Sequence, residues 1–93
     1  MKTVRVAIEG EVQGVWYRGW TVDEASRRGL SGWVRNRRGG TVEAVFAGDS
    51  ERVDDMIAAC WNGPPAARVR AVHVHEDTDA APAENGFYQA PTA

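Results

Sequence analysis

The glycine spacing between residues 10 and 18 suggests a loop that could bind an anion. Gly10 and Gly14 flank three residues, and Arg18 follows four positions later. Glycine adopts backbone conformations that a β-carbon forbids, and a tight loop leading into a helix points several N–H groups at one place. An arginine in the first helical turn can then add a guanidinium that matches the oxygens of a phosphoryl group. Taken alone, the segment fits an ordinary glycine turn beside a surface arginine slightly better.

The second feature is an asparagine at the end of the segment Gly32-Trp33-Val34-Arg35-Asn36. Asparagine is depleted in strands, and here it lies on the same strand face as Gly32 and Val34, just before a hairpin turn. Its amide can donate one hydrogen bond and accept another, so it could orient a water molecule. On this segment alone, the simpler interpretation, in which Asn36 caps the hairpin backbone, is favoured.

The hydrophobic pattern predicts the elements that must position these residues. Alternation over 3–9 is typical of a half-buried strand, and the i, i+3, i+4, i+7 stripe after Asp49 is typical of an amphipathic helix. The expected elements are a strand over 3–9, a helix over 16–28 with a glycine cap at 29, strands over 32–37 and 41–47, a helix that Asp49 or Ser50 caps and 62–65 ends, a strand over 69–76 and a short edge strand over 87–91.

This β-α-β-β-α-β order predicts an α+β protein with a ferredoxin-like α/β sandwich. We expect an antiparallel sheet of four to five strands with both helices on one face. Ninety-three residues predict a single domain over 1–93. The acidic segment 77–86, rich in alanine and proline, is expected to be a mobile linker to the edge strand. The fold hosts many unrelated functions, so it predicts no activity by itself.

Composition restricts the class of ligand. The formal net charge is −2, which does not favour nucleic acid. Residues 14–40 nevertheless contain six arginines, a pattern that fits a small anion at one site, although most of these arginines are expected to cover helix and hairpin faces. Cys60 falls in an apolar stripe and is expected to be a buried thiol. Nothing resembles a signal peptide or a membrane span, so we expect a cytoplasmic protein.

Two long motifs occur in order along the chain. Residues 10–18 follow the pattern Gly, any, Val, Gln, Gly, Val, any, aromatic, Arg. Residues 32–36 are followed by Gly40-Thr41-Val42 and then by Gly48. Together these motifs resemble the two signatures of the acylphosphatase family, and the resemblance covers the chain to about Glu76. It implies an enzyme that hydrolyses the carboxyl–phosphate bond of small acyl phosphates to a carboxylate and inorganic phosphate, with no metal or other cofactor.

The resemblance also implies roles for individual residues. Arg18 matches the phosphate-binding arginine, Asn36 matches the residue that orients the attacking water, and Thr41 matches a supporting hairpin position. The residues that match the loop whose amides bind phosphate are Gln13, Gly14, Val15, Trp16 and Tyr17. Inorganic phosphate is expected as product and inhibitor, and the protein is expected to be a monomer that binds neither nucleic acid nor membrane.

Several positions depart from the family pattern or invite another interpretation. Gly19 and Gln89 replace a larger residue and an apolar residue, respectively, and Arg37 stands where uncharged residues also occur. Trp16 and Trp33 are expected to border the site. The other side chains are assigned to structure: Trp20 and Trp61 to packing, Glu9 and Glu11 to solvated surface, and His73 and His75 to a solvent-facing strand and not to a metal site. Two further functions stay open, a non-catalytic module that binds a phosphorylated metabolite and, less favoured, an RNA-binding sheet.

Overall fold

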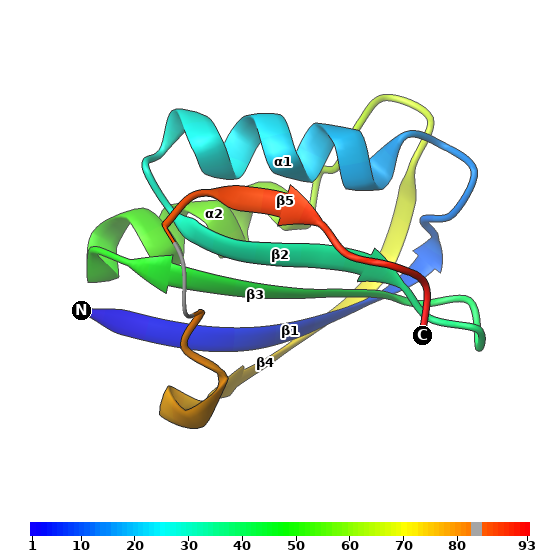
Figure 1. Ribbon diagram of the computed structural model, residues 1–93. Coiled ribbons are helices and arrows are strands. Elements are labelled where there is room, and N and C mark those ends of the chain that lie inside the picture. The colour runs from blue at the N-terminus through cyan, green and yellow to red at the C-terminus, as the bar shows by residue number, and fades with distance from the viewer. Residues whose placement is uncertain (83–84) are drawn as a thin grey trace.

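The computed structural model describes residues 1–82 and 85–93, and it contains one five-stranded sheet with two helices on one face (Figure 1). The elements match the predicted order, with ends that differ by one or two residues. They are β1 (Lys2–Glu11), α1 (Tyr17–Arg27), β2 (Ser31–Asn36), β3 (Val42–Gly48), α2 (Ser50–Cys60), β4 (Arg68–Glu76), the 3-10 turn η1 (Thr78–Ala80) and β5 (Phe87–Gln89).

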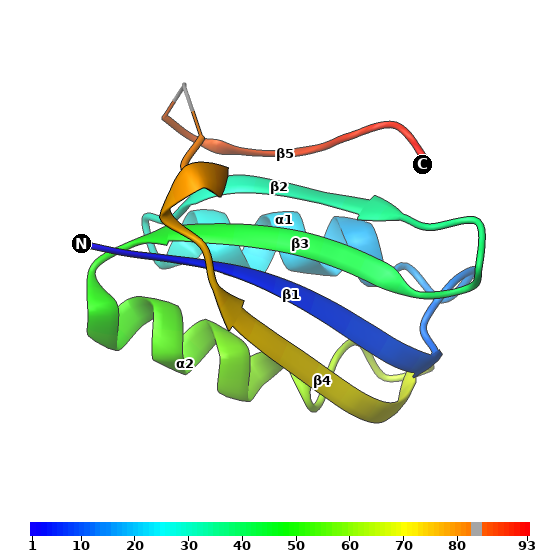
Figure 2. The same ribbon diagram turned by 90° about the horizontal axis from the view of Figure 1, so that it is seen from below.

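The strands lie in the order β4-β1-β3-β2-β5, which Figure 2 shows with the helices behind the sheet. β1 pairs antiparallel with both β3 and β4, and β2 pairs antiparallel with β3. These four strands form the expected ferredoxin-like sandwich. Because β1 and β3 occupy the middle of the sheet, the two loops that carry the sequence motifs emerge from neighbouring strands.

The fifth strand makes the sheet mixed, whereas a wholly antiparallel sheet was expected. β5 pairs with β2 in parallel, with Gly32 opposite Phe87 and Val34 opposite Gln89. The chain reaches this edge near the start of β2, where the Gly32 amide donates to the Gly86 carbonyl at 3.0 Å. From that point β5 can only run in the same direction as β2.

Alternation along the central strands builds the core, as the sequence predicts. Val4, Val6 and Ile8 of β1 are fully buried against the helices. Val53, Met56 and Cys60 are the buried residues of α2, so the predicted stripe faces the sheet. Burial raises the pKa of the Cys60 thiol to about 12, so at neutral pH this cysteine is a protonated core residue and not a nucleophile.

The helix ends follow the predicted chemistry. Gly29, directly after the C-cap of α1, has a φ of 70°, a left-handed conformation that glycine adopts without strain. At the start of α2, the Asp49 carboxylate accepts a hydrogen bond from the Arg52 amide at 3.4 Å. This contact satisfies one of the free amides at the helix N-terminus.

Replacing Asp49 with alanine should lower the free energy of unfolding by about 1 kcal/mol, the usual loss for an N-cap acceptor. Chemical denaturation followed by circular dichroism measures the change. Ser50→Ala is the matched control, because its neighbour Asp49 supplies the cap. Equal losses in the two variants would contradict the capping role of Asp49.

The segment 77–86 contains more structure than a linker alone. Thr78–Ala80 form a 3-10 turn on the sheet face opposite the helices (Figure 2), and the Asp77 amide donates to the Thr3 carbonyl at 3.1 Å. Residues 83–84 lie outside the described residues. The mobility of the segment and its role as a linker therefore stay predictions, while Phe87–Gln89 form the edge strand β5.

No helix in residues 1–82 or 85–93 combines the length and the apolar character that crossing a membrane requires.

Candidate functional site

The loop between β1 and α1 has the backbone conformation that the glycine spacing suggests. Gly14 has a φ of 75°, and Trp16, the N-cap of α1, has a φ of 69°. A left-handed conformation at a tryptophan is uncommon and costs about 1–2 kcal/mol. This conformation turns the chain directly into α1, so the free amides of the first helical turn point into the space beside the loop.

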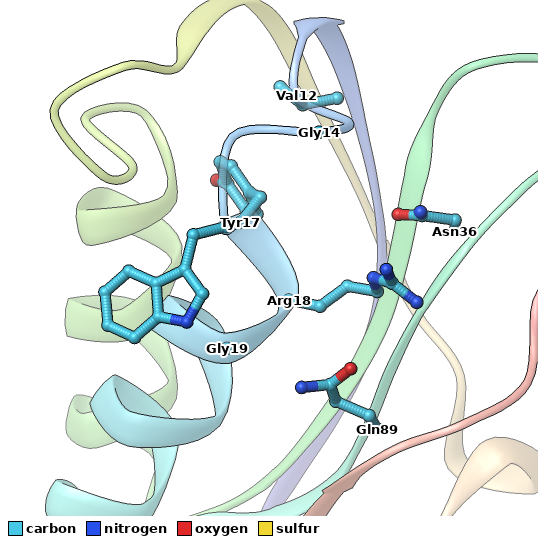
Figure 3. A pocket seen from close by; sticks show the side chains of 8 residues that line it. Val12, Gly14, Tyr17, Arg18, Gly19, Asn36 and Gln89 are labelled. Atoms are coloured by element: carbon cyan, nitrogen blue, oxygen red, sulfur yellow. The ribbon is translucent and has the colours of Figure 1, made fainter.

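That space is a pocket of about 120 Å³ at the start of α1 (Figure 3). Its walls come from the loop, the first turn of α1, the end of β2 and the last strand. The residues that line it are Val12, Gly14, Trp16, Tyr17, Arg18, Gly19, Asn36 and Gln89. The structure thus brings together Arg18 and Asn36, which are far apart in the sequence. The small volume suits a compact anion.

Arg18 extends from α1 into the pocket, and its guanidinium lies between Asn36 and Gln89 (Figure 3). Among residues 1–82 and 85–93, no carboxylate lies within 4 Å of this guanidinium, whereas other arginines of the basic region are paired. Arg27 and Arg28 bind Glu24 on the surface of α1. Arg18 therefore keeps its charge and its donors available for an anion.

Glu43 explains why three further arginines stay away from the pocket. It accepts from Arg35 at 2.7 Å and from Arg5 at 3.1 Å, and it lies 3.4 Å from Arg37, on the sheet face opposite the helices. Burial tends to raise the pKa of Glu43, but the hydrogen bonds and charges of Arg35 and Arg5 outweigh it and hold that pKa below its usual range. These arginines have a structural role, as the composition analysis expected.

Asn36 ends β2 on the helix side of the sheet, the face that its spacing from Val34 predicts. Its backbone is held on both sides: it pairs in register with Val42 of β3, and its carbonyl accepts from the Ala93 amide at 3.0 Å. The Asn36 amide group points into the pocket, beside the Arg18 guanidinium (Figure 3). The side chain is thus placed by strand pairing and is free to contact a ligand.

Gln13 and Thr41 lie behind the loop and do not line the pocket. The Gln13 side chain donates to the carbonyls of Arg37 and Thr41, both at 2.8 Å. The Thr41 carbonyl also accepts from the Arg37 amide at 2.9 Å. This bridge ties the loop to the hairpin that carries Asn36, so it joins the two halves of the site.

Tyr17 contributes to the pocket through its position in the first helical turn, while its side chain is buried. Its hydroxyl donates to the Cys60 carbonyl at 2.5 Å, and burial, followed by the proximity of Cys60, raises the pKa of Tyr17. The bond anchors the start of α1 to the end of α2. The remaining loop residue, Val15, packs against the core and does not line the pocket.

The expectation that Trp33 borders the site is wrong. Trp33 precedes Val34 and follows Gly32, so strand alternation places it on the face opposite the helices. There the guanidiniums of Arg5 and Arg35 lie over its ring, at 5.7 Å and 4.6 Å from the ring centroid. Trp16 does line the pocket.

Of the other two tryptophans, Trp20 has the expected packing role, while Trp61 lies outside the core cluster. Trp20 packs against the core, with its ring centroid 5.3 Å from that of Tyr17. Trp61 lies at the rim, half exposed.

Gly19 departs from the family pattern for a steric reason. A β-carbon at this position would lie 2.1 Å from Nε1 of the Trp16 indole. The indole therefore lies flat against the helix backbone, in space that any other residue at 19 would occupy. The pair Trp16 and Gly19 forms one wall of the pocket.

Replacing Gly19 with alanine should displace the Trp16 indole and change the Michaelis constant for acyl phosphates. Alanine favours the helix interior by about 1 kcal/mol over glycine, so the melting temperature should not fall. The control is the same substitution in a Trp16→Ala background, where it should stabilise the protein and leave the Michaelis constant unaltered. An equal kinetic effect in both backgrounds would contradict the contact.

Sequence reasoning missed three residues that line the pocket: Val12, Gly19 and Gln89. Val12 lies within the first motif but was given no role from the sequence, and in the structure its side chain is buried. Gly19 and Gln89 did carry a signal, since both stood out as departures from the family pattern. At both positions, a departure from the family pattern was thus a pointer to the site.

His73 and His75 form no metal site in the described part of the chain. His73 pairs with Glu9, which also binds Arg70, and the hydrogen bonds from His73 and Arg70 hold the pKa of Glu9 below its usual value. No three His, Cys, Asp or Glu side chains among the described residues are grouped to hold a metal. Glu9 was expected to be solvated surface, but in the structure it pairs with His73 and Arg70.

A family model, two relatives and a solved structure all indicate the same family. The model of the family described as Acylphosphatase matches residues 4–88. The chain is 55% identical over 92 residues to the acylphosphatase of Rhodospirillum rubrum, covering 99% of each protein, and 54% identical over 88 residues to that of Rhizorhabdus wittichii, covering 95% of this chain and 87% of the relative. The crystal structure of acylphosphatase from Bacillus subtilis superposes with a TM-score of 0.91 at 32% identity, covering 97% of this chain and 99% of that one.

Proposed function

We propose that Arg18 and the amides of the 13–17 loop bind a phosphoryl group and that Asn36 orients the attacking water, because this chain belongs to the acylphosphatase family. Membership makes the protein a hydrolase of acid anhydrides, which cleaves acyl phosphates to a carboxylate and inorganic phosphate. The observation that carries the assignment of roles is the pocket at the start of α1, which Arg18 and Asn36 both line.

Phosphoryl binding rests on charge and donor geometry. The guanidinium offers a planar set of donors, and the amides at the start of α1 add the positive end of the helix dipole. Together these groups can surround three phosphoryl oxygens. In phosphoryl transfer most of the rate enhancement comes from positioning and from stabilising this charge.

Water attack needs orientation more than it needs a strong base. Among the described residues, no His, Asp or Glu lines the pocket, and a carboxylate is a good leaving group. The water oxygen forms the new bond to phosphorus while the bond from phosphorus to the acyl oxygen breaks, and its electron pair leaves with the carboxylate. A phosphoryl oxygen of the substrate takes the water's proton. Asn36 then has one task, which is to hold the water in line.

The same geometry supports several further proposals about the protein in solution. A pocket of about 120 Å³ at the surface takes a small acyl phosphate, and inorganic phosphate, which carries the group that the pocket binds, should compete with it. The chain is proposed to act as a single domain, as a monomer and in the cytoplasm, with no nucleic acid or membrane as partner.

Hydrolysis should survive removal of metal ions. Within residues 1–82 and 85–93 the pocket is lined by no His, Cys or carboxylate ligand, so acetyl phosphate or benzoyl phosphate should be consumed at the same rate with and without EDTA. Substrate loss and phosphate release measure the rate. Loss of turnover in EDTA that zinc or magnesium restores would contradict this mechanism. Tight binding of phosphate without turnover would indicate a non-catalytic module instead.

A further inference from the structure

Gln89 is a polar side chain in the pocket to which the proposed function gives no task. It lies in β5 and lines the pocket together with Arg18 and Asn36. Its side chain is exposed, and it makes no hydrogen bond within the described residues. The carboxamide therefore has a donor and an acceptor available for a ligand.

The backbone holds Gln89 firmly in this position. Gln89 pairs in register with Val34 of β2, and in parallel strands register partners lie on the same face of the sheet. The next amide, that of Ala90, donates to the Val34 carbonyl at 2.8 Å, and the Ala93 amide donates to the Asn36 carbonyl at 3.0 Å. The last strand and the tail that follows it thus fix Gln89 relative to Asn36.

The two carboxamides flank the cation from different sides. Figure 3 shows the Arg18 guanidinium between the Asn36 and Gln89 side chains. In a phosphoryl transfer the attacking and leaving oxygens lie roughly in line, on opposite sides of phosphorus. If Arg18 binds the phosphoryl oxygens and Asn36 holds the water, the acyl group leaves on the Gln89 side.

We propose that Gln89 binds the acyl group, donating from Nε2 to its carbonyl oxygen and accepting at Oε1 from an N–H group where the acyl group has one. A carboxamide is complementary to a carbamoyl group, since each offers one donor and one acceptor. The carbonyl oxygen gains negative charge as the carboxylate leaves, so the donated bond strengthens in the transition state. Gln89 is in this view a specificity residue that favours carbamoyl over acetyl phosphate. The inference rests on the proposed roles of Arg18 and Asn36.

The test compares two substrates in three proteins. Gln89→Met keeps the length of the side chain and removes both hydrogen-bonding groups. Tyr88→Leu is the matched control, because it alters the neighbouring residue of the same strand, which is exposed and pairs with Trp33 on the opposite face. The measurements are kcat/KM for carbamoyl phosphate and for acetyl phosphate, the inhibition constant of inorganic phosphate, and the melting temperature.

Gln89→Met should lower the ratio of kcat/KM for carbamoyl phosphate to that for acetyl phosphate by about 2- to 10-fold, the range for one neutral hydrogen bond. Inhibition by inorganic phosphate should stay unchanged, because phosphate has no acyl group. Tyr88→Leu should leave the ratio and the inhibition constant as they are. Because the ratio compares two substrates of one protein preparation, partial misfolding does not alter it.

Two results overturn the inference in distinguishable ways. A wild-type ratio retained by Gln89→Met, in a protein that hydrolyses both substrates, removes the role of Gln89 and leaves the proposed function intact. No phosphate release by the wild-type protein from either substrate overturns the proposed function and the role of Gln89 together. A weakened phosphate inhibition in Gln89→Met also counts against the inference, since it would place Gln89 on the phosphoryl group.

Discussion

Replacing Arg18 with alanine should lower kcat/KM for an acyl phosphate by about 100- to 1000-fold, the scale for one preorganised donor aimed at developing charge. The guanidinium lies in the pocket with no carboxylate partner among the described residues, so its loss removes the main positive charge from the site. Inhibition by inorganic phosphate should weaken as well, because the ground state carries the same charge. Steady-state kinetics with acetyl phosphate, with and without added phosphate, measure both effects.

Two further variants test whether the effect is specific to the Arg18 guanidinium. Arg18→Lys should restore little activity, since a point charge cannot replace a planar fork of donors. Arg38→Ala removes an exposed arginine from the nearby hairpin turn and should leave activity almost unchanged. If Arg18→Ala retained near-wild-type turnover, or if Arg38→Ala lost as much, the guanidinium would have no specific role.

Replacing Asn36 with alanine should lower the turnover number by at least about 100-fold, the cost of misplacing a reacting group, while the Michaelis constant and phosphate inhibition change little. A residue that orients only the water contributes little to ground-state binding of substrate. The free energy of unfolding should change by no more than about 0.5 kcal/mol, because the Asn36 side chain is part-exposed and strand pairing uses only its backbone.

The alternative interpretation of Asn36 predicts the reverse pattern. If the side chain merely capped the hairpin, Asn36→Ala would melt at a lower temperature and would keep its turnover per folded molecule. Asn36→Asp adds a separate control, since it keeps the shape but loses the donor and places a negative charge near Arg18. It should lose turnover and also weaken phosphate inhibition, in contrast to Asn36→Ala.

Local patterns predicted most of the fold because each of them has a direct structural consequence. The alternation of Val4, Val6 and Ile8 is confirmed as the buried face of β1, and Asp49 is confirmed as the cap of α2. The direction of β5 was not predictable in this way. Three residues of strand carry no periodic signal, and their pairing with β2 depends on where a long connection delivers the chain.

The parts of the site that lie within one local motif were predictable from the sequence. Contacts between side chains that are distant in the sequence were less predictable. Arg18 and Asn36 were candidates by their types and by their place beside a turn, but each segment alone favoured a structural role, and the resemblance to the family supplied the expected functions. The placement of Trp33 was wrong, although alternation from Asn36 alone puts it on the opposite face. The bridge from Gln13 to the hairpin carbonyls could not be foreseen, because the same residue was a candidate for binding through its amide.

β5 follows every other element of the site in the sequence, so it should join the sheet last during folding. The loop, Arg18 and Asn36 lie within residues 10–42, and the core that supports them is complete with β4 at Glu76, whereas Gln89 follows in β5. A chain is synthesised from its N-terminus, so β5 is the last of these elements to become available for pairing. A newly synthesised chain should therefore be able to bind phosphate before β5 pairs with β2 and places Gln89 in the pocket. Binding of the phosphoryl group would then develop before selectivity for the acyl group.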